Sequence, residues 1–191
     1  MIKQTKRYQM QLPKPFALAI IVGLATLAAP AGAQDTTGGV DQAFVTQFVH
    51  ANDHEIEQAQ AELTDAADPG IILFANTMIK DHAAANGQVA AAARSLGLTY
   101  PQSHIMTGRQ GATSPGRSAS PMSPKAYMEL QVQEHQSVIG LLQGEADNGS
   151  SAQLKTIAAQ TLPVAKAHLA MAQQFLTSGT VSPEVLPSPG S

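Results

Sequence analysis

The chain has 191 residues, a formal net charge of −3 and no cysteine. The lack of cysteine excludes disulfides, thiolate metal sites and thiol catalysis, so packing alone must hold the protein together. The length suits one domain. Aromatic residues make up only 4% of the chain, which means that small side chains must supply much of the packing.

Residues 1–33 are predicted to be a secretory signal peptide. A basic start precedes an apolar run from Phe16 to Ala29, and Ala31-Gly32-Ala33 is the small-x-small pattern that a signal peptidase cuts. The run is shorter than the roughly 20 residues of a membrane-spanning helix. We therefore expect cleavage after Ala33, a periplasmic or secreted protein, and no integral membrane segment after cleavage.

Cleavage at this point would change the charge of the protein. It removes four of the 11 basic residues and none of the 14 acidic ones, so the net charge falls from −3 to −7. Such an acidic surface repels phosphate backbones, which disfavours nucleic acid as a partner. An envelope protein remains a candidate partner, and the sequence leaves the oligomeric state open.

After a flexible N-terminus over 34–40, two helices are predicted in the first half of the domain. The first runs from about Asp41 to Ala66, and its buried stripe at steps of three and four holds Phe44, Phe48, Glu55, Ala59 and Glu62. The second opens with an N-cap and a proline at Asp68-Pro69 and ends near Leu96 before Gly97. Its stripe holds Ile71, Ala75, Met78, His82, Ala85, Val89 and Ala92.

Two more helices are predicted after a polar Gly/Ser/Pro-rich loop over 98–123. The third runs from Ser123-Pro124 to about Asp147, and its stripe holds Tyr127, Leu130, Glu134, Val138, Leu141 and Leu142, with Met128 and His135 on the flank. The fourth begins after Ser150 or Ser151 and ends before Gly179. Its apolar side holds Leu154, Ile157, Ala158, Ala165, His168, Leu169, Ala172, Phe175 and Leu176.

These elements predict an all-α fold over 41–178, because no stretch alternates as a half-buried strand does. Four amphipathic helices joined by a short, a long and a short connection indicate a ferritin-like four-helix bundle, with a long flexible connection between helices 2 and 3. The proline-rich residues 179–191 are predicted to be a disordered tail.

Four polar residues lie within or beside the predicted stripes: Glu55, His82, His135 and His168. Counting from the short turns places all four near mid-bundle, within about two helical turns of one another. One polar group from each helix could therefore converge on one interior point.

Two interpretations of this convergence stay open. Imidazole and carboxylate ligands suit a transition-metal site for zinc, copper, iron or manganese. Alternatively, the same residues form a buried polar network that is satisfied internally or by backbone, for which Pro163 frees the carbonyl of Ala159.

Di-iron chemistry is disfavoured in either case. Di-iron carboxylate bundles carry Glu-x-x-His on each of two helices. Here the residue three before His82 is Ile79, and the residue three before His168 is Ala165. The bridging carboxylates are thus missing.

A second histidine pair, His50 and His54, has the i, i+4 spacing that could clamp a metal on one helix. The pair lies opposite the apolar stripe beside Asn52 and Asp53, which predicts a solvated face. No phosphate-binding loop, nucleophile elbow or zinc-protease signature appears in the sequence, so an enzymatic function is disfavoured.

Several short motifs follow one another in a specific order: Ala51-Asn52, Glu55-Ile56-Glu57, Phe74-Ala75, Met78-Ile79, Asp81-His82, Asn86, Tyr127, His135, Leu162-Pro163 and His168. Over residues 41 to 177, this pattern resembles the bacterial family known as domain of unknown function 4142. The resemblance implies an exported protein with a ferritin-like fold, and it supplies no established reaction.

Two functions of different classes follow from the sequence. The first is a non-catalytic envelope protein, stress-related or interaction-mediating, whose buried histidines are structural. The second is a metal-binding (copper, zinc or iron) or metal-dependent redox protein with Glu55, His82, His135 and His168 as the candidate ligands.

Overall fold

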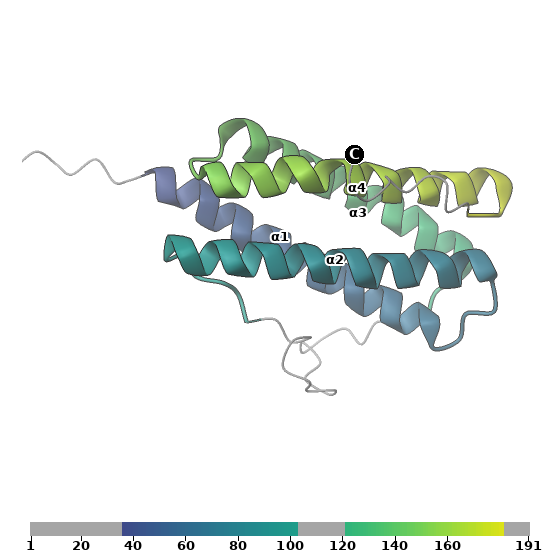
Figure 1. Cartoon of the computed structure of the whole chain (residues 1–191). Coiled ribbons are helices and arrows are strands. Elements are labelled where there is room, and N and C mark those ends of the chain that lie inside the picture. Colours follow the sequence, from purple (N-terminus) through teal and green to yellow (C-terminus); the bar gives the residue numbers. More distant parts are fainter. Residues whose placement is uncertain (1–35, 103–120, 182–191) are drawn as a thin grey trace, which may run out of the picture. The chain divides into compact units, whose positions relative to one another are not determined.

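The structure is a computed structural model, and it describes residues 36–102 and 121–181. The predicted signal peptide, most of the predicted loop 98–123 and most of the predicted tail lie outside the described residues. The described part contains four helices and no strand, which confirms the all-α prediction (Figure 1). The helices are α1 (Thr36–Leu63), α2 (Pro69–Leu96), α3 (Pro124–Asn148) and α4 (Ala152–Ser178).

The starts of three helices follow the capping signals in the sequence. The side chain of Asp68 accepts hydrogen bonds from the backbone N–H groups of Gly70 and Ile71, which caps α2. Ser123 and Ser151 cap α3 and α4 in the same way. Capping satisfies N–H groups that have no partner within the helix, so these boundaries lie where the sequence predicts them.

The start of α1 differs from the prediction. The helix begins at Thr36, so it extends into the segment 34–40 that the sequence predicts to be flexible. Asp41 supplies a physical reason, because its carboxylate accepts a 2.7 Å hydrogen bond from the backbone N–H of Ser150. This contact ties the first turns of α1 to the connection between α3 and α4.

The helices form two pairs, since α1 packs mainly against α2 and α3 mainly against α4. The end of α2 lies near the start of α1, where Gln42 exchanges hydrogen bonds of 2.8 Å with the backbone of Thr99. The start of α3 lies near the end of α1, where the N–H of Met122 donates to Glu62. Thus α2 and α3 run in the same direction (Figure 1). The ferritin-like label itself stays a prediction.

The core has two apolar clusters. The first contains Phe44, Val45, Phe48, Val49, Ala85, Val89, Ala92, Ala93, Val138, Leu142, Leu154, Ile157, Ala158 and Ala165. The second contains Ala59, Ile71, Phe74, Ala75, Met78, Tyr127, Met128, Met171, Ala172 and Phe175. Along each helix the two clusters are separated by buried polar residues, which we call the polar layer: Asn52, Glu55, Gln58, His82, Asn86, Gln131, His135 and His168.

The buried face of α3 is rotated relative to the predicted stripe. Leu130, Glu134 and Leu141 are only half-buried, whereas Gln131 and His135 are fully buried at 0% exposure. The reason is that α3 contributes polar side chains to the layer, so the most apolar face of this helix is not its most buried face. His135, predicted at the edge, lies at the centre.

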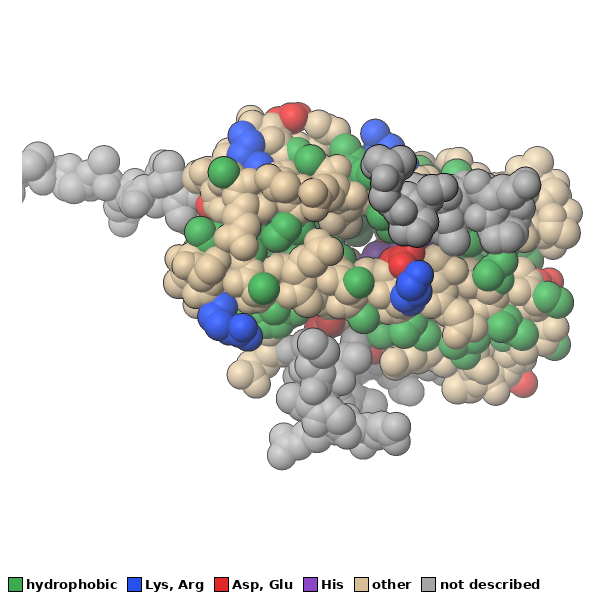
Figure 2. All heavy atoms as spheres, viewed as in Figure 1, with side chains coloured by type: hydrophobic (Ala, Val, Ile, Leu, Met, Phe, Trp, Pro, Cys, Tyr) green, Lys and Arg blue, Asp and Glu red, His purple; other side chains and the backbone are tan. Residues whose placement is uncertain are grey.

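Within residues 36–102 and 121–181, no helix is long and apolar enough to cross a membrane. Figure 2 shows one face of the molecule, on which hydrophobic and uncharged side chains prevail and charged ones are scattered. On this face a histidine is visible at the seam between α2 and α4, next to an acidic side chain.

Candidate metal centre

The structure brings three of the predicted site residues together in the polar layer. His82 of α2, His135 of α3 and His168 of α4 each offer a ring nitrogen, and these nitrogens all lie within 4.8 Å of one another. None of the three histidines is more than 5% exposed. The interior convergence predicted from the helical spacing is thus present for the histidines.

In two of the histidines, the hydrogen-bond partners indicate which ring nitrogen carries the proton. Nδ1 of His135 lies 3.0 Å from the carbonyl oxygen of Gln131, which can only accept, so Nδ1 carries the proton. Nε2 of His168 lies 3.1 Å from a carboxylate oxygen of Asp81, so there Nε2 carries it. The other two nitrogens, Nε2 of His135 and Nδ1 of His168, face each other at 3.3 Å.

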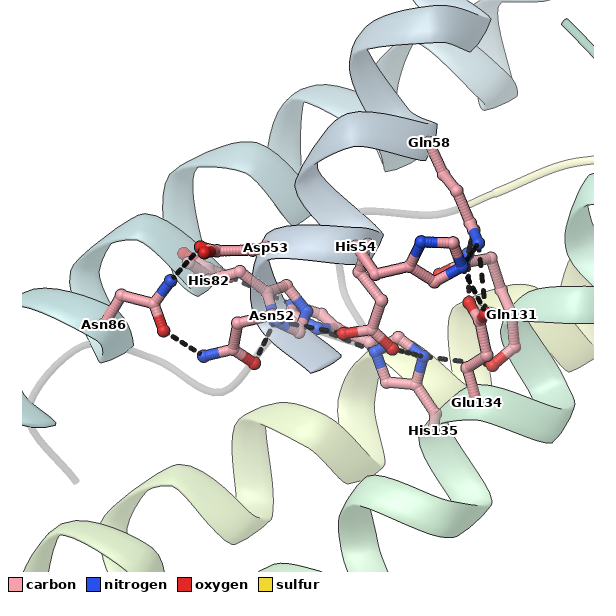
Figure 3. Close-up of polar contacts among 12 residues, drawn as sticks. Asn52, Asp53, His54, Gln58, His82, Asn86, Gln131, Glu134 and His135 are labelled. Carbon is pink, nitrogen blue, oxygen red and sulfur yellow. Dashed lines mark hydrogen bonds and ion pairs between the residues drawn. The ribbon is translucent and has the colours of Figure 1, made fainter. Parts of the chain in front are cut away.

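A relay of side chains on α1 and α2 determines the orientation of His82 (Figure 3). The amide N–H of Asn86 donates to Asp53, so the oxygen of Asn86 is free to accept from the amide of Asn52. The oxygen of Asn52 therefore points at Nδ1 of His82, 2.8 Å away, and accepts a hydrogen bond from the Nδ1–H group. Nε2 of His82 is left as a buried lone pair with no hydrogen-bond partner.

The three rings thus direct their protons outward to acceptors and keep one lone pair each. Outer acceptors of this kind, a carbonyl, a carboxylate or an amide oxygen, are what orient metal-binding histidines. Two nitrogens bound tetrahedrally to one zinc ion at about 2.0–2.1 Å lie about 3.3 Å apart. The facing nitrogens of His135 and His168 have this separation, which is also within the range of a hydrogen bond between them when one of the two carries a proton.

Burial keeps the imidazoles of His82 and His135 neutral. Burial lowers the pKa of His135 to about 3, and the neighbouring His168 lowers it further. The pKa of His82 is also well below its ordinary value because of burial, with His168 and His135 contributing. Neutral imidazole is the form that binds a metal ion, so both rings are ready to bind at neutral pH.

Glu55 of α1 completes the layer. It lies beside the Nδ1 atoms of His82 and His135, on the side of these two rings opposite their Nε2 atoms. Its oxygens lie 3.1 Å from Nδ1 of His82 and 3.6 Å from Nδ1 of His135. The carboxyl is 1% exposed and neither oxygen has a hydrogen-bond partner. Burial raises the pKa of Glu55 to about 8, with Glu134 contributing, so an isolated Glu55 is mostly protonated at neutral pH.

The second predicted histidine pair does not form a joint site. His50 and His54 are both exposed, as the position opposite the stripe predicts. His54, however, turns toward α3, where its Nε2 lies 3.4 Å from a carboxylate oxygen of Glu134. The amide of Gln58 lies 2.6 Å from the same nitrogen.

Sequence reasoning missed the residues that position the histidines. Asn52 was placed with the solvated face, and this placement is wrong, because Asn52 is fully buried. A signal was present, since Asn52 follows Phe48 by four positions and precedes Glu55 by three, which is the spacing of one helix face. The role of Asp81 could not be found in this way, because its partner His168 lies 87 positions away.

The fold and the site define a four-helix, all-α bundle whose interior is interrupted at mid-length by a layer of histidines and hydrogen-bonding partners. The chain belongs to the family described as domain of unknown function (DUF4142), whose model matches residues 25–175. This match confirms the family that the sequence motifs resemble. Neither the comparison with curated proteins nor the comparison with solved structures finds a match.

Proposed function

We propose that this protein is exported to the cell envelope and binds one divalent transition-metal ion in its polar layer. His82, His135 and His168 are the proposed ligands, and Glu55 is the candidate carboxylate. One observation carries the proposal: three buried imidazoles are held by outer acceptors, each offers a ring nitrogen within 4.8 Å of the others, and Nε2 of His82 has no hydrogen-bond partner.

The residues present fit such an ion chemically. Nitrogen ligands with one carboxylate suit zinc, copper, iron or manganese, and the missing bridging carboxylates still disfavour a di-iron centre. When bound, the ion would supply a Lewis acid or, for copper, iron or manganese, a redox centre. A buried cation also favours the ionised form of Glu55, whose negative charge would offset part of the charge of the ion.

One observation favours the second candidate, a non-catalytic envelope protein with structural histidines. With neutral His82 and His135 and a protonated Glu55, this part of the layer carries no charge without an ion. Burying this part of the layer then costs only the free energy of burying neutral polar groups, which is much smaller than the cost of burying ions. In this case the function would lie in a stress-related or partner-binding role of the outer surface.

Metal analysis and thermal melting of protein purified without a histidine tag separate the two candidates. The variants are His82→Leu and the matched control His50→Ala, each with zinc, copper or iron and with chelator. Metal at 100 times the Kd stabilises the native state by about 3 kcal/mol. We expect this gain in wild type and in His50→Ala but not in His82→Leu. A wild-type melting temperature that no metal moves would rule out the metal site.

A further inference from the structure

A groove opens between α1 and α3 on the side of the polar layer where Glu55 lies. It has a volume of about 330 Å³, and its walls include Ala51, His54 and Glu55 of α1 and Glu134 and Ser137 of α3. The groove runs along one of the seams where the two helix pairs meet. Glu55 is the buried polar-layer residue among those that line it.

Glu55 connects this groove with the histidine cluster. The same side chain lines the groove and has its two oxygens 3.1 Å from His82 and 3.6 Å from His135. Neither oxygen accepts a hydrogen bond, and the protein donors that face the carboxyl are the Nδ1–H groups of His82 and His135, which already donate to Asn52 and Gln131. Glu55 is therefore placed to contact an ion in the groove and an ion beside the histidines.

The mouth of the groove carries a second pair of metal-binding groups. The imidazole of His54 is 51% exposed and lies 3.4 Å from the carboxylate of Glu134, which is 21% exposed. The amides of Gln58 and Gln131 donate to the two oxygens of Glu134 at 3.0 and 3.2 Å and hold that carboxylate in place (Figure 3). An imidazole and a carboxylate thus lie between solvent and Glu55.

We propose that this α1–α3 groove is the route by which a divalent transition-metal cation enters and leaves the histidine cluster. His54 and Glu134 take the ion from solvent, and Glu55, which faces the Nδ1 side of His82 and His135, takes it to the edge of the histidine cluster. The inference rests on the proposed function, because a route requires a site. It adds a role for His54 and Glu134, which do not touch the three histidine ligands.

The seam between α2 and α4 is the rival route, and its size argues against it. The cavity there, lined in part by Asp81, Thr161 and His168, has a volume of about 10 Å³. A cavity of this volume holds about one water, whereas a hydrated divalent cation carries several. The ion would have to lose its water before meeting a ligand on this side, whereas the α1–α3 groove admits it hydrated.

The first test obstructs each route in turn and measures loading with Co²⁺, whose visible absorption reports nitrogen and carboxylate ligation. Ser137→Trp fills the α1–α3 groove from an exposed position, and Thr161→Trp fills the α2–α4 seam. We expect Ser137→Trp to slow both association and chelator-driven release by about tenfold or more, with an unchanged Kd, because it raises the barrier between unchanged end states. Thr161→Trp should load at the wild-type rate.

The second test removes the charge at the mouth. Glu134→Gln should slow association at low ionic strength, with a smaller effect at high salt, because the carboxylate attracts the cation through solvent. Glu129→Gln, an exposed residue of the same helix, is the control and should load normally.

Three outcomes separate the claims. Wild-type rates in both Ser137→Trp and Glu134→Gln would overturn the route and leave the site intact. Slowing by Thr161→Trp alone would assign entry to the α2–α4 seam and also overturn the route. A wild type that shows no Co²⁺ spectrum would overturn the site and the route together.

Discussion

The two apolar clusters and the polar layer between them are equally buried but obey different rules. In the clusters, any side chains that fill the space at native density satisfy the fold. In the polar layer, every donor and acceptor needs a partner, because an unpaired buried polar group costs free energy. On the outer side of the layer, where the histidine N–H groups point, Asp53, Asn86, Asn52 and Asp81 meet this demand. On the inner side, atoms such as Nε2 of His82 and the oxygens of Glu55 have no hydrogen-bond partner.

This difference shows that the apolar clusters are needed to hold the fold together, whereas the polar layer is not. The clusters suffice to hold four helices together, so a layer with unpaired lone pairs adds no stability that larger apolar side chains would not provide. A well-packed apolar layer is often as stable as, or more stable than, a buried polar one. The unpaired inner side of the layer is therefore the part of the molecule that requires a functional explanation.

The largest effect on stability should come from the second apolar cluster. Phe74 is fully buried and packs edge-to-face against Tyr127, with ring centroids 5.8 Å apart. Phe74→Ala should lower the free energy of unfolding by about 3–5 kcal/mol, through lost burial and a cavity. The measurement is urea unfolding with chelator present.

The control for this change is Leu96→Ala, at a residue that is 41% exposed, which should change the free energy of unfolding by no more than about 0.5 kcal/mol. If Phe74→Ala proved as mild as Leu96→Ala, the clusters would not be the part that holds the bundle together.

A smaller effect, and one of a different kind, is expected at the outer side of the polar layer. Asp81→Leu removes the acceptor that holds Nε2–H of His168. We expect the affinity for metal to fall about 10–100-fold, the usual cost of losing such an outer partner. Asp81→Asn, which can still accept through its amide oxygen, should retain most of the affinity.

Competition titration with a chromophoric chelator measures this change, and Asp65→Leu, at an exposed position, is the control. Equal affinities of wild type and Asp81→Leu would mean that His168 is oriented by packing alone. The claim that hydrogen-bond acceptors around the layer orient its histidines would then be wrong.

The sequence predicts the helices and clusters well because their signals are local. The capping residues Asp68, Ser123 and Ser151 identify helix starts, and the apolar spacing of α2 identifies residues that are all buried in the structure. Such features depend on neighbours within a few positions. The start of α1 was less predictable, and the contact of its first turns with Ser150 joins residues 109 positions apart.

The polar layer is only partly predictable for the same reason. Helical spacing places His82 and His168 in buried stripes, so their meeting can be inferred. Hydrophobicity cannot distinguish a buried polar residue from a solvated one, and for this reason the face of α3 that carries Gln131 was misplaced. Hydrogen-bond partners from different helices, such as Asp81 and His168, follow only from the three-dimensional packing.

The smallest effect is expected at a buried carboxyl outside the polar layer, Glu145 near the end of α3. It is 3% exposed, and its pKa is raised to about 7 by burial and by the nearby Asp41. Because the native state holds this proton more tightly than the unfolded state does, stability falls as the pH rises from about 4.5 to 7 and stays lower above that. Glu145→Gln removes this ionisation and offers an amide to Asp41.

Glu145→Gln should therefore raise the free energy of unfolding by about 1–2 kcal/mol at pH 8 and have little effect at pH 4. The expected gain is smaller than the full pKa shift would give, because solvent near the end of the helix screens the charge. Urea unfolding at both pH values measures this difference, with Glu129→Gln as the exposed control. The melting response to metal should equal that of wild type, because Glu145 lies outside the polar layer. A gain in stability at pH 8 together with an altered metal response would mean that a carboxyl outside the polar layer influences metal binding. The claim that metal binding depends on the polar layer alone would then be wrong.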